Sequence, residues 1–239
     1  MRPKTLLLLS TAAAAVLAAA ACSRCSAPAA PHDPPAPAEP KPGDPLLKVD
    51  GITITFGDVL PLVEYFDTLS REGSRRTKMQ RVIEEYALPL QFARREFLQE
   101  REKELAEAKG LRAVCGNVLE LEEKSSAFRP TRKRVKPRDV EIPIARFLFD
   151  KLHQGAVSDP IELPQGYTVV GSFELVEAQL LFDDLCDSLQ VTFYTPQLHD
   201  TQAYEHWLAA LQARLMRLDK KATWYHPDYR DAVPSWLLP

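Results

Sequence analysis

Proline is the residue that most limits where this chain can fold. Eight of its 20 prolines lie between Ser26 and Pro45, a stretch with no Phe, Trp or Tyr and no branched aliphatic residue. Such a segment cannot bury a core, and it stays extended or disordered. We therefore interpret residues 23–45 as a tether. The folded body begins near Leu46, and about 194 residues remain, enough for one sizeable core or two small ones.

The segment before the tether has the pattern of an export signal. Arg2 and Lys4 precede an apolar run, residues 6–21, in which Ser10 and Thr11 are the only polar residues. The run is shorter than the roughly 20 apolar residues that a membrane-spanning helix needs. The sequence therefore predicts a signal peptide over residues 1–22, no transmembrane helix, and export to the bacterial cell envelope.

The end of this run resembles the lipobox of bacterial lipoproteins, where small residues precede a cysteine that becomes acylated. Here the residues are Ala19, Ala20, Ala21 and Cys22, with Ala19 at the place where the family usually has Leu. The resemblance implies lipidation of Cys22 and a membrane contact through that anchor. The alternative is a soluble secreted protein cut at a nearby A-x-A site.

The charge of the chain argues against a nucleic-acid partner, but one cluster of basic residues needs an explanation. The net charge of −3 gives no overall attraction to nucleic acid, and we expect no nucleic-acid partner. The chain also has a basic run, which comprises Arg129, Arg132, Lys133, Arg134, Lys136 and Arg138. Pro130 and Pro137 interrupt this run, so we interpret it as a solvated loop. The alternative is contact with anionic lipid head groups or acidic clients.

The folded body opens with a hairpin and a helix. Apolar residues alternate around Asp50 and Gly51, which predicts a short hairpin or a strand with a turn. Thr55 and Asp58 then have the spacing of a capping box, which predicts a helix directly after the hairpin.

Helices are expected over most of the next 60 residues. Residues 76–109 have amphipathic spacing, but Pro89 predicts two helices or one kinked helix. Gly110 is expected to cap the second helix, and residues 111–123 form a further amphipathic stretch. Near the C-terminus, residues 203–217 have one apolar face.

Two of these segments resemble known families. "VDGITITFGDV" followed by amphipathic helices resembles the N-terminal chaperone domain of SurA-like and PrsA-like periplasmic foldases. Residues 147–175 resemble the C-terminal half of a parvulin, or PpiC-type, prolyl isomerase domain. The matching residues are Leu152, Gly155, Val157, Ser158, Pro160, Gly166, Tyr167 and Val169.

The resemblance implies an α+β fold with three parts. Residues 46–125 would form a helical SurA-like domain. Residues 126–177 would form the basic loop and a truncated parvulin-like unit, which is inserted into the helical domain. Residues 178–239 would pack back on the helical domain. Four aromatic residues near the C-terminus are expected to support this packing, with an exposed client-binding strip as the alternative; they are Trp224, Tyr225, Tyr229 and Trp236.

The parvulin-like segment departs from its family where the chemistry should be. The family's last strand carries a histidine directly after the aromatic residue of the Gly-aromatic turn, and here that place is Thr168. There is no histidine between His32 and His153, and residues 125–143 are too short for the missing strand, helix and Gly-rich loop. We therefore predict no catalytic residue and no cofactor. The resemblance leaves a peptide-binding role, assigned to Phe147, Phe149, Leu152 and Tyr167.

Cysteine and histidine positions suggest little further chemistry. Cys115 and Cys186 are able to form a disulfide in an oxidising compartment, and the alternative is two buried apolar thiols. The histidines are scattered, so no metal site is predicted. The function that these features favour is an exported chaperone that holds unfolded chains without isomerase activity. An active peptidyl-prolyl isomerase and a structural lipoprotein of an envelope complex are the alternatives.

Overall fold

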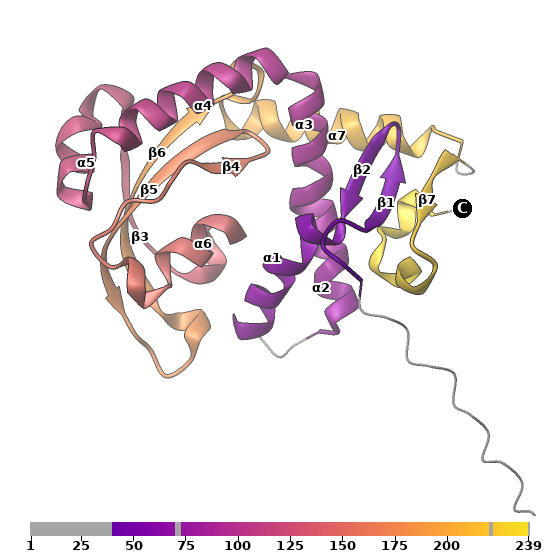
Figure 1. Ribbon diagram of the computed structural model, residues 1–239, viewed down its shortest axis with the longest axis horizontal. Coiled ribbons are helices and arrows are strands. Elements are labelled where there is room, and N and C mark those ends of the chain that lie inside the picture. Colours follow the sequence, from indigo (N-terminus) through magenta and orange to yellow (C-terminus); the bar gives the residue numbers. More distant parts are fainter. Residues whose placement is uncertain (1–39, 70–72, 220–221, 239) are drawn as a thin grey trace, which may run out of the picture. The chain divides into compact units, whose positions relative to one another are not determined.

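Helices and short antiparallel strands alternate along the residues that the structure describes. The computed structural model describes residues 40–69, 73–219 and 222–238 (Figure 1). It contains two antiparallel sheets together with helices, which confirms the α+β class. The expected signal peptide, Cys22 and the tether up to residue 39 lie outside the described residues. No described helix is both long enough and apolar enough to cross a bilayer.

The first sheet is built on the predicted hairpin. Strands β1 (Pro45–Val49) and β2 (Ile52–Thr55) pair antiparallel. Asp50 and Gly51 have φ values of 48° and 77°, the left-handed conformation that the tight turns of two-residue hairpins require. The short strand β7 (Trp224–Tyr225) pairs with the other edge of β1. A segment near the C-terminus thus completes a sheet that begins near residue 45.

The capping box after the hairpin is also confirmed. Thr55 N–H donates to Asp58 Oδ2 at 2.8 Å, and Asp58 N–H donates to Thr55 Oγ1 at 3.3 Å. These bonds satisfy backbone donors that the first turn of a helix leaves free. Helix α1 (Phe56–Leu69) starts there, as predicted.

The chain bends at a different residue from the one predicted. Helix α2 (Arg75–Val82) runs through a π-helical turn, Ile83–Ala87, into helix α3 (Leu88–Glu96). Pro89 lies in the first turn of α3, where its missing N–H costs little. The break comes at Phe97, with φ −125° and ψ 34°, before helix α4 (Leu98–Ala113). Gly110 lies inside α4, so its prediction as a helix cap was wrong.

One hydrophobic core joins α1, α2 and α3 to the first sheet and the C-terminal segment. Helix α7 (Thr201–Met216) contributes Leu211 and Leu215 to this core. Tyr225, Tyr229 and Trp236 pack against the same cluster. The fourth aromatic, Trp224, stays 41% exposed. The predicted core packing of the C-terminal aromatics therefore holds for three of the four side chains.

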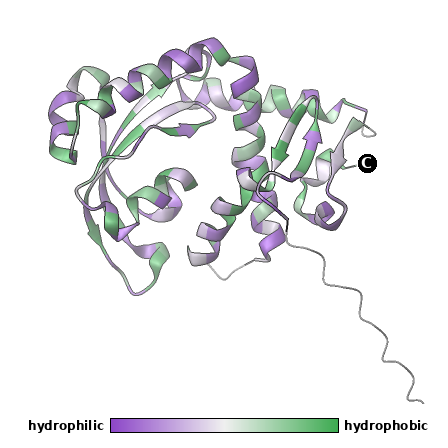
Figure 2. Cartoon of the chain, in the orientation of Figure 1, coloured by the Kyte–Doolittle hydropathy of each residue, from purple (hydrophilic) through white to green (hydrophobic). Residues whose placement is uncertain are grey.

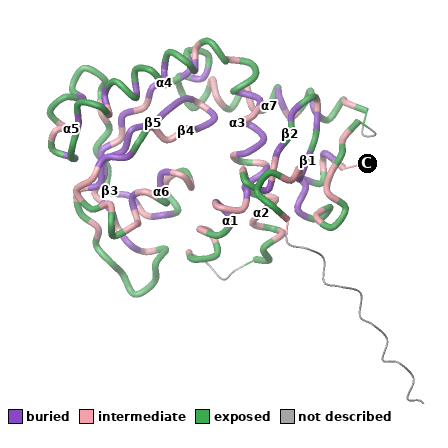
Figure 3. The backbone as a smooth tube through the Cα atoms, viewed as in Figure 1, coloured by how far each residue is buried: buried purple, intermediate pink, exposed green. Residues whose placement is uncertain are grey.

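The second sheet has helices on both faces. Its strand order is β3 (Thr131–Val135), β6 (Leu185–Tyr194), β5 (Gly166–Val176) and β4 (Ile161–Leu163). Helices α4 and α5 (Val118–Lys124) cover one face, and α6 (Ile142–Leu148) covers the other (Figure 1). Strand β5 is buried along most of its length (Figure 3). Helix α4 carries both hydrophilic and hydrophobic residues (Figure 2).

Three predicted boundaries are corrected by this sheet. Arg132, Lys133 and Arg134 of the basic run lie in strand β3 and not in a loop. The first four residues of β3 are exposed, because an edge strand tolerates charged side chains in water. Residues 185–194 extend the sheet instead of returning to the helical core, because β6 pairs with β5 over nearly its whole length. Helices α4 and α5 pack on the sheet, so the helical core ends near Glu96 and not at residue 125.

Candidate functional site

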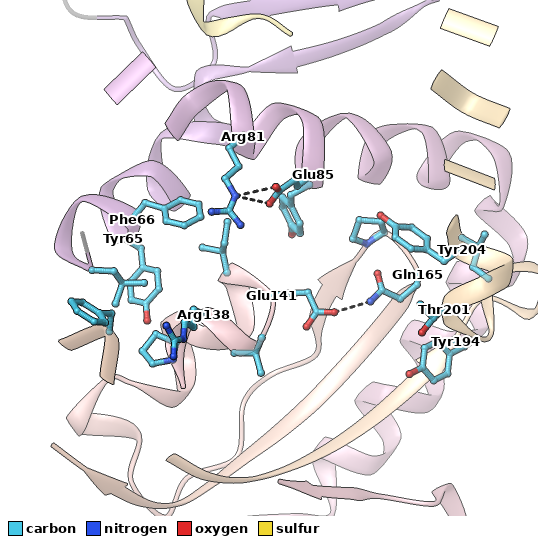
Figure 4. Close-up of a pocket in the computed structure, with 18 of the residues that line it drawn as sticks. Tyr65, Phe66, Arg81, Glu85, Arg138, Glu141, Gln165, Tyr194, Thr201 and Tyr204 are labelled. Carbon is cyan, nitrogen blue, oxygen red and sulfur yellow. Dashed lines mark hydrogen bonds and ion pairs between the residues drawn. The ribbon is translucent and has the colours of Figure 1, made fainter. Parts of the chain in front are cut away.

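A cleft of about 570 Å³ lies between the helical core and the second sheet (Figure 4). One wall comes from α1, the end of α2 and the π-helical turn; it consists of Tyr65, Phe66, Leu69, Arg81, Glu85 and Tyr86. The other wall comes from the segment entering α6, the β4–β5 turn, the end of β6 and the start of α7. Its main side chains are those of Glu141, Gln165, Phe182, Tyr194, Thr201 and Tyr204.

Helix α1 contacts the helical core along its first part and lines the cleft at its C-terminal end. Val59, Leu62 and Val63 are buried in the helical core. Tyr65, Phe66 and Leu69 follow at the C-terminal end of the helix, where they line the cleft. Residues four apart lie on the same side of a helix, so Tyr65 and Leu69 make one continuous surface.

Aromatic rings carrying hydroxyl groups dominate the lining. Burial raises the pKa of Tyr86 and of Tyr204 to about 12, and burial also raises the pKa of Tyr65. These phenols therefore stay neutral and act as hydrogen-bond donors and acceptors. Tyr86 Oη already donates to Glu162 O at 2.8 Å. Tyr65 Oη is buried and has no hydrogen-bond partner among the described residues.

Most of the charged groups in the cleft are already paired. Arg81 Nε lies 2.8 and 3.0 Å from the carboxylate oxygens of Glu85. Gln165 Nε2 donates to Glu141 Oε1 at 3.0 Å (Figure 4). Asp200 accepts from Ala203 N–H at 2.7 Å as the cap of α7. The lining described here contains no histidine or cysteine. No group among the described residues has the arrangement of a metal site. What the lining offers a ligand is aromatic surface and tyrosine hydroxyl groups.

A buried arginine holds the sheet side of the cleft in place. Arg101 is 2% exposed; its guanidinium donates to Leu163 O at 2.9 Å, to Pro164 O at 3.0 Å and to Glu162 Oε1 at 3.0 Å. Arg94 makes a second ion pair with Glu162. Burial raises the pKa of Glu162, but the hydrogen bonds and charges of the two arginines outweigh it and hold that pKa below its usual value. The β4–β5 turn is thus fastened to α3 and α4.

The four residues predicted to bind peptide do not form one site. Tyr167 belongs to the cluster under α4, whereas Phe147 and Phe149 pack against the cluster on the α6 face. Leu152 is 87% exposed and lies apart from both. The sheet separates Tyr167 from the phenylalanines, so the structure does not bring the four residues together. None of the four lines the aromatic cleft.

Thr168 is inaccessible at the place where a parvulin has its second histidine. Its side chain is 0% exposed, and its hydroxyl lies 3.0 Å from Thr192 Oγ1 on β6. A fully buried threonine cannot reach a substrate and offers no group that titrates near neutral pH. The degenerate half-parvulin segment therefore supplies no catalytic group at this position.

Cys115 and Cys186 are both free, buried thiols. Cys115 belongs to the α4–α5 cluster and Cys186 to the α6 cluster, so the two sulfurs lie in separate parts of the core. Cys186 Sγ lies 3.3 Å from Ser172 Oγ. The structure thus lacks the disulfide that the sequence permits, and the two cysteines pack as small apolar side chains.

Comparisons with known proteins find no match to any family model, to any curated protein or to any solved structure. The resemblance to SurA-like foldases and parvulins therefore rests on the sequence motifs alone.

Proposed function

We propose that this chain is an exported, chaperone-like protein of the bacterial envelope that holds segments of unfolded polypeptide in the aromatic cleft. The observation that carries the proposal is the lining, where Tyr65, Phe66, Tyr86, Tyr194 and Tyr204 surround about 570 Å³ and the lining carboxylates are mostly engaged.

The chemistry of these side chains suits a ligand of variable sequence. Tyrosine offers a large apolar surface at a low cost in side-chain entropy, and its hydroxyl is able to bond to any backbone carbonyl. The volume falls within the usual range of ligand sites, about 300–1,000 Å³. It would accommodate a few side chains of an extended client and not a folded domain.

The proposed location comes from the sequence. The signal-like residues 1–22 favour export, and the lipobox-like context of Cys22 favours a lipid anchor. In that arrangement the proline-rich residues before Lys41 would hold the folded body away from the membrane. The predicted tether is too long at its C-terminal end, because Pro45 belongs to β1 and Pro42 O accepts from Gly57 N–H at 2.7 Å. The partners would be unfolded exported polypeptides and the membrane itself.

A charge placed at the mouth of the cleft should weaken client binding. Tyr194 is 46% exposed and lines the cleft, so Tyr194→Lys adds an ammonium group there without opening a core cavity. We expect the dissociation constant for a permanently unfolded, carboxymethylated protein to rise at least tenfold, about 1.4 kcal/mol. Fluorescence anisotropy with residues 40–239 measures it; this segment contains all three core clusters.

Leu119→Lys is the matched control. Leu119 is 67% exposed on α5 and does not line the cleft. The control should bind the client within twofold of the parent protein. Equal weakening by both substitutions, or no weakening by either, would show that the cleft is not the binding site. A parent protein that binds no unfolded chain would favour the third class, a structural or adaptor lipoprotein.

The second candidate function is prolyl isomerisation. The hairpin β4–β5, in which Gly166 and Tyr167 follow the turn, carries the parvulin resemblance. We expect residues 40–239 to leave the slow cis–trans exchange of a proline test peptide at its uncatalysed rate, because its barrier is about 20 kcal/mol and Thr168 is buried. A protease-coupled assay measures this rate. Acceleration of this exchange to the rate of an ordinary parvulin would favour prolyl isomerisation as the function.

A further inference from the structure

The loop between β5 and β6 exposes three large apolar side chains in a row. Leu180 and Leu181 are each 54% exposed, and Phe182 is 36% exposed. Single apolar side chains on a surface are ordinary, but a run of three makes a continuous patch of the kind that marks an interaction site. Residues 180–182 form what we call the rim patch.

Polar contacts hold this loop in a fixed shape. Asp184 is 4% exposed, and its Oδ1 accepts from Ala178 N–H at 2.7 Å across the base of the loop. Residues Leu181–Asp183 form a 3-10 turn. Lys136 Nζ donates to Asp183 Oδ1 at 2.9 Å and ties the loop to the end of β3. The apolar side chains of the rim patch are thus held at the surface by the bonds of the loop itself.

The rim patch is continuous with the aromatic cleft. Phe182 lines the cleft, whereas Leu180 and Leu181 lie outside its lining. The loop packs beside α1, the helix that supplies Tyr65 and Phe66 to one end of the cleft (Figure 4). A polypeptide that leaves the cleft at this end would meet the two leucines next. Because a cleft of about 570 Å³ holds only a few side chains, a longer client segment has to leave it.

The charges of the loop favour a polypeptide partner over a lipid surface. Residues 177–184 include three acidic side chains and no basic one. The nearby ammonium groups of Lys136 and Lys151 are already paired, with Asp183 at 2.9 Å and with Glu177 at 2.7 Å. Segments that dock on anionic membranes combine apolar side chains with basic ones. The loop lacks this second component.

We propose that the rim patch is a second contact for the client, and that the protein prefers unfolded segments with large aliphatic residues next to the stretch held in the cleft. The inference rests on the proposed polypeptide-binding function and names the class of segment that this site selects. An aliphatic side chain that covers Leu180 and Leu181 removes apolar surface of both partners from water. Because the loop is already ordered, its ordering costs little on binding.

Two peptides and two variants of residues 40–239 test this contact. Both unstructured peptides have the same centre of alternating phenylalanine and serine. The first has two leucines on each side of the centre, and the second has serines in those places. The loop variant combines Leu180→Ser and Leu181→Ser. The control variant combines Val114→Ser and Leu119→Ser, because these side chains are 53% and 67% exposed and neither lines the cleft.

The parent protein should bind the leucine peptide at least fivefold more tightly than the serine peptide, about 1 kcal/mol. Fluorescence anisotropy measures both dissociation constants. The control variant should keep this preference, and the loop variant should bind the two peptides within about twofold of each other. A preference that survives in the loop variant, or that is absent from the parent, would overturn the rim patch as a client contact.

A further variant separates this inference from the proposed function. Tyr194→Lys should weaken the binding of both peptides, because both place their centre in the cleft. If it does so while the loop variant keeps the leucine preference, the rim patch is overturned and the cleft remains the binding site. A parent protein that binds neither peptide would overturn both proposals.

The alternative partner, a lipid surface, is tested with the same proteins. Sedimentation with vesicles of phosphatidylglycerol and phosphatidylcholine should show equally weak binding by the parent and by the loop variant. Vesicle binding that the loop variant loses, with the peptide preference unchanged, would show that the rim patch contacts a membrane and not a client.

Discussion

Replacing Arg101 by alanine is expected to lower the free energy of unfolding by about 3–5 kcal/mol. The side chain is 3% exposed and bonds to Glu162 and to the carbonyls of Leu163 and Pro164. Its removal leaves two buried acceptors without a donor and removes one of the two cations that balance Glu162. Urea denaturation of the parent and the variant measures the difference.

A surface ion pair provides the control for this effect. Lys151 Nζ lies 2.7 Å from Glu177 Oε1, but both side chains are more than half exposed. Lys151→Ala should therefore change stability by less than about 1 kcal/mol. A loss of stability from Arg101→Ala as small as that of the control would show that Arg101 does not hold the β4–β5 turn in place. The depressed pKa of Glu162 adds a pH signature, because its stabilising charge is lost as the pH falls through that folded-state pKa.

Replacing Gly166 by alanine is expected to cost about 3–5 kcal/mol. Gly166 has φ +149°, and a Cβ atom there would lie 2.0 Å from Phe193 O on the neighbouring strand. The clash is with backbone, so β5 and β6 would have to separate where the β4–β5 turn meets the cleft. Thermal and urea unfolding measure the loss.

Gly110→Ala is the matched control for this substitution. Gly110 lies inside α4, and a Cβ atom there meets nothing within 4 Å. Alanine should stabilise the protein by about 0.5–1 kcal/mol, because glycine is a poor helix former. The prediction is that Gly166→Ala destabilises the protein and Gly110→Ala stabilises it. A neutral Gly166→Ala would show that the two strands are able to move apart at little cost.

Local sequence signals predicted the local structure well. The Asp50-Gly51 turn, the Thr55–Asp58 capping box and the helix after it were all readable, because each depends on residues within a few positions of one another. The α+β class came from the family resemblance, and the two sheets with their helices confirm it. The sequence of β6 also has the pattern typical of a strand, because buried Leu189, Val191 and Phe193 alternate with more exposed residues.

The long-range arrangement was not available from local pattern. The cleft brings together residues from α1, the π-helical turn, β6 and α7, which lie up to about 140 positions apart, and no motif links them. Arg101 was hidden among many charged residues of α4, where sequence gives no sign of which one is buried. The four residues predicted to bind peptide lie apart for a related reason. The Tyr167 side chain faces α4, whereas Phe147 on α6 lies on the opposite face of the sheet.

The most direct test of the central claim is to locate a bound client on residues 40–239. A photoreactive residue placed at Tyr204, which lines the cleft, should cross-link a permanently unfolded protein. The same residue placed at Leu119 on α5 should give no more cross-link than a sample without illumination. Strong labelling from position 204 alone is the result that the proposed function predicts. Equal labelling from both positions, or labelling from position 119 alone, would contradict it.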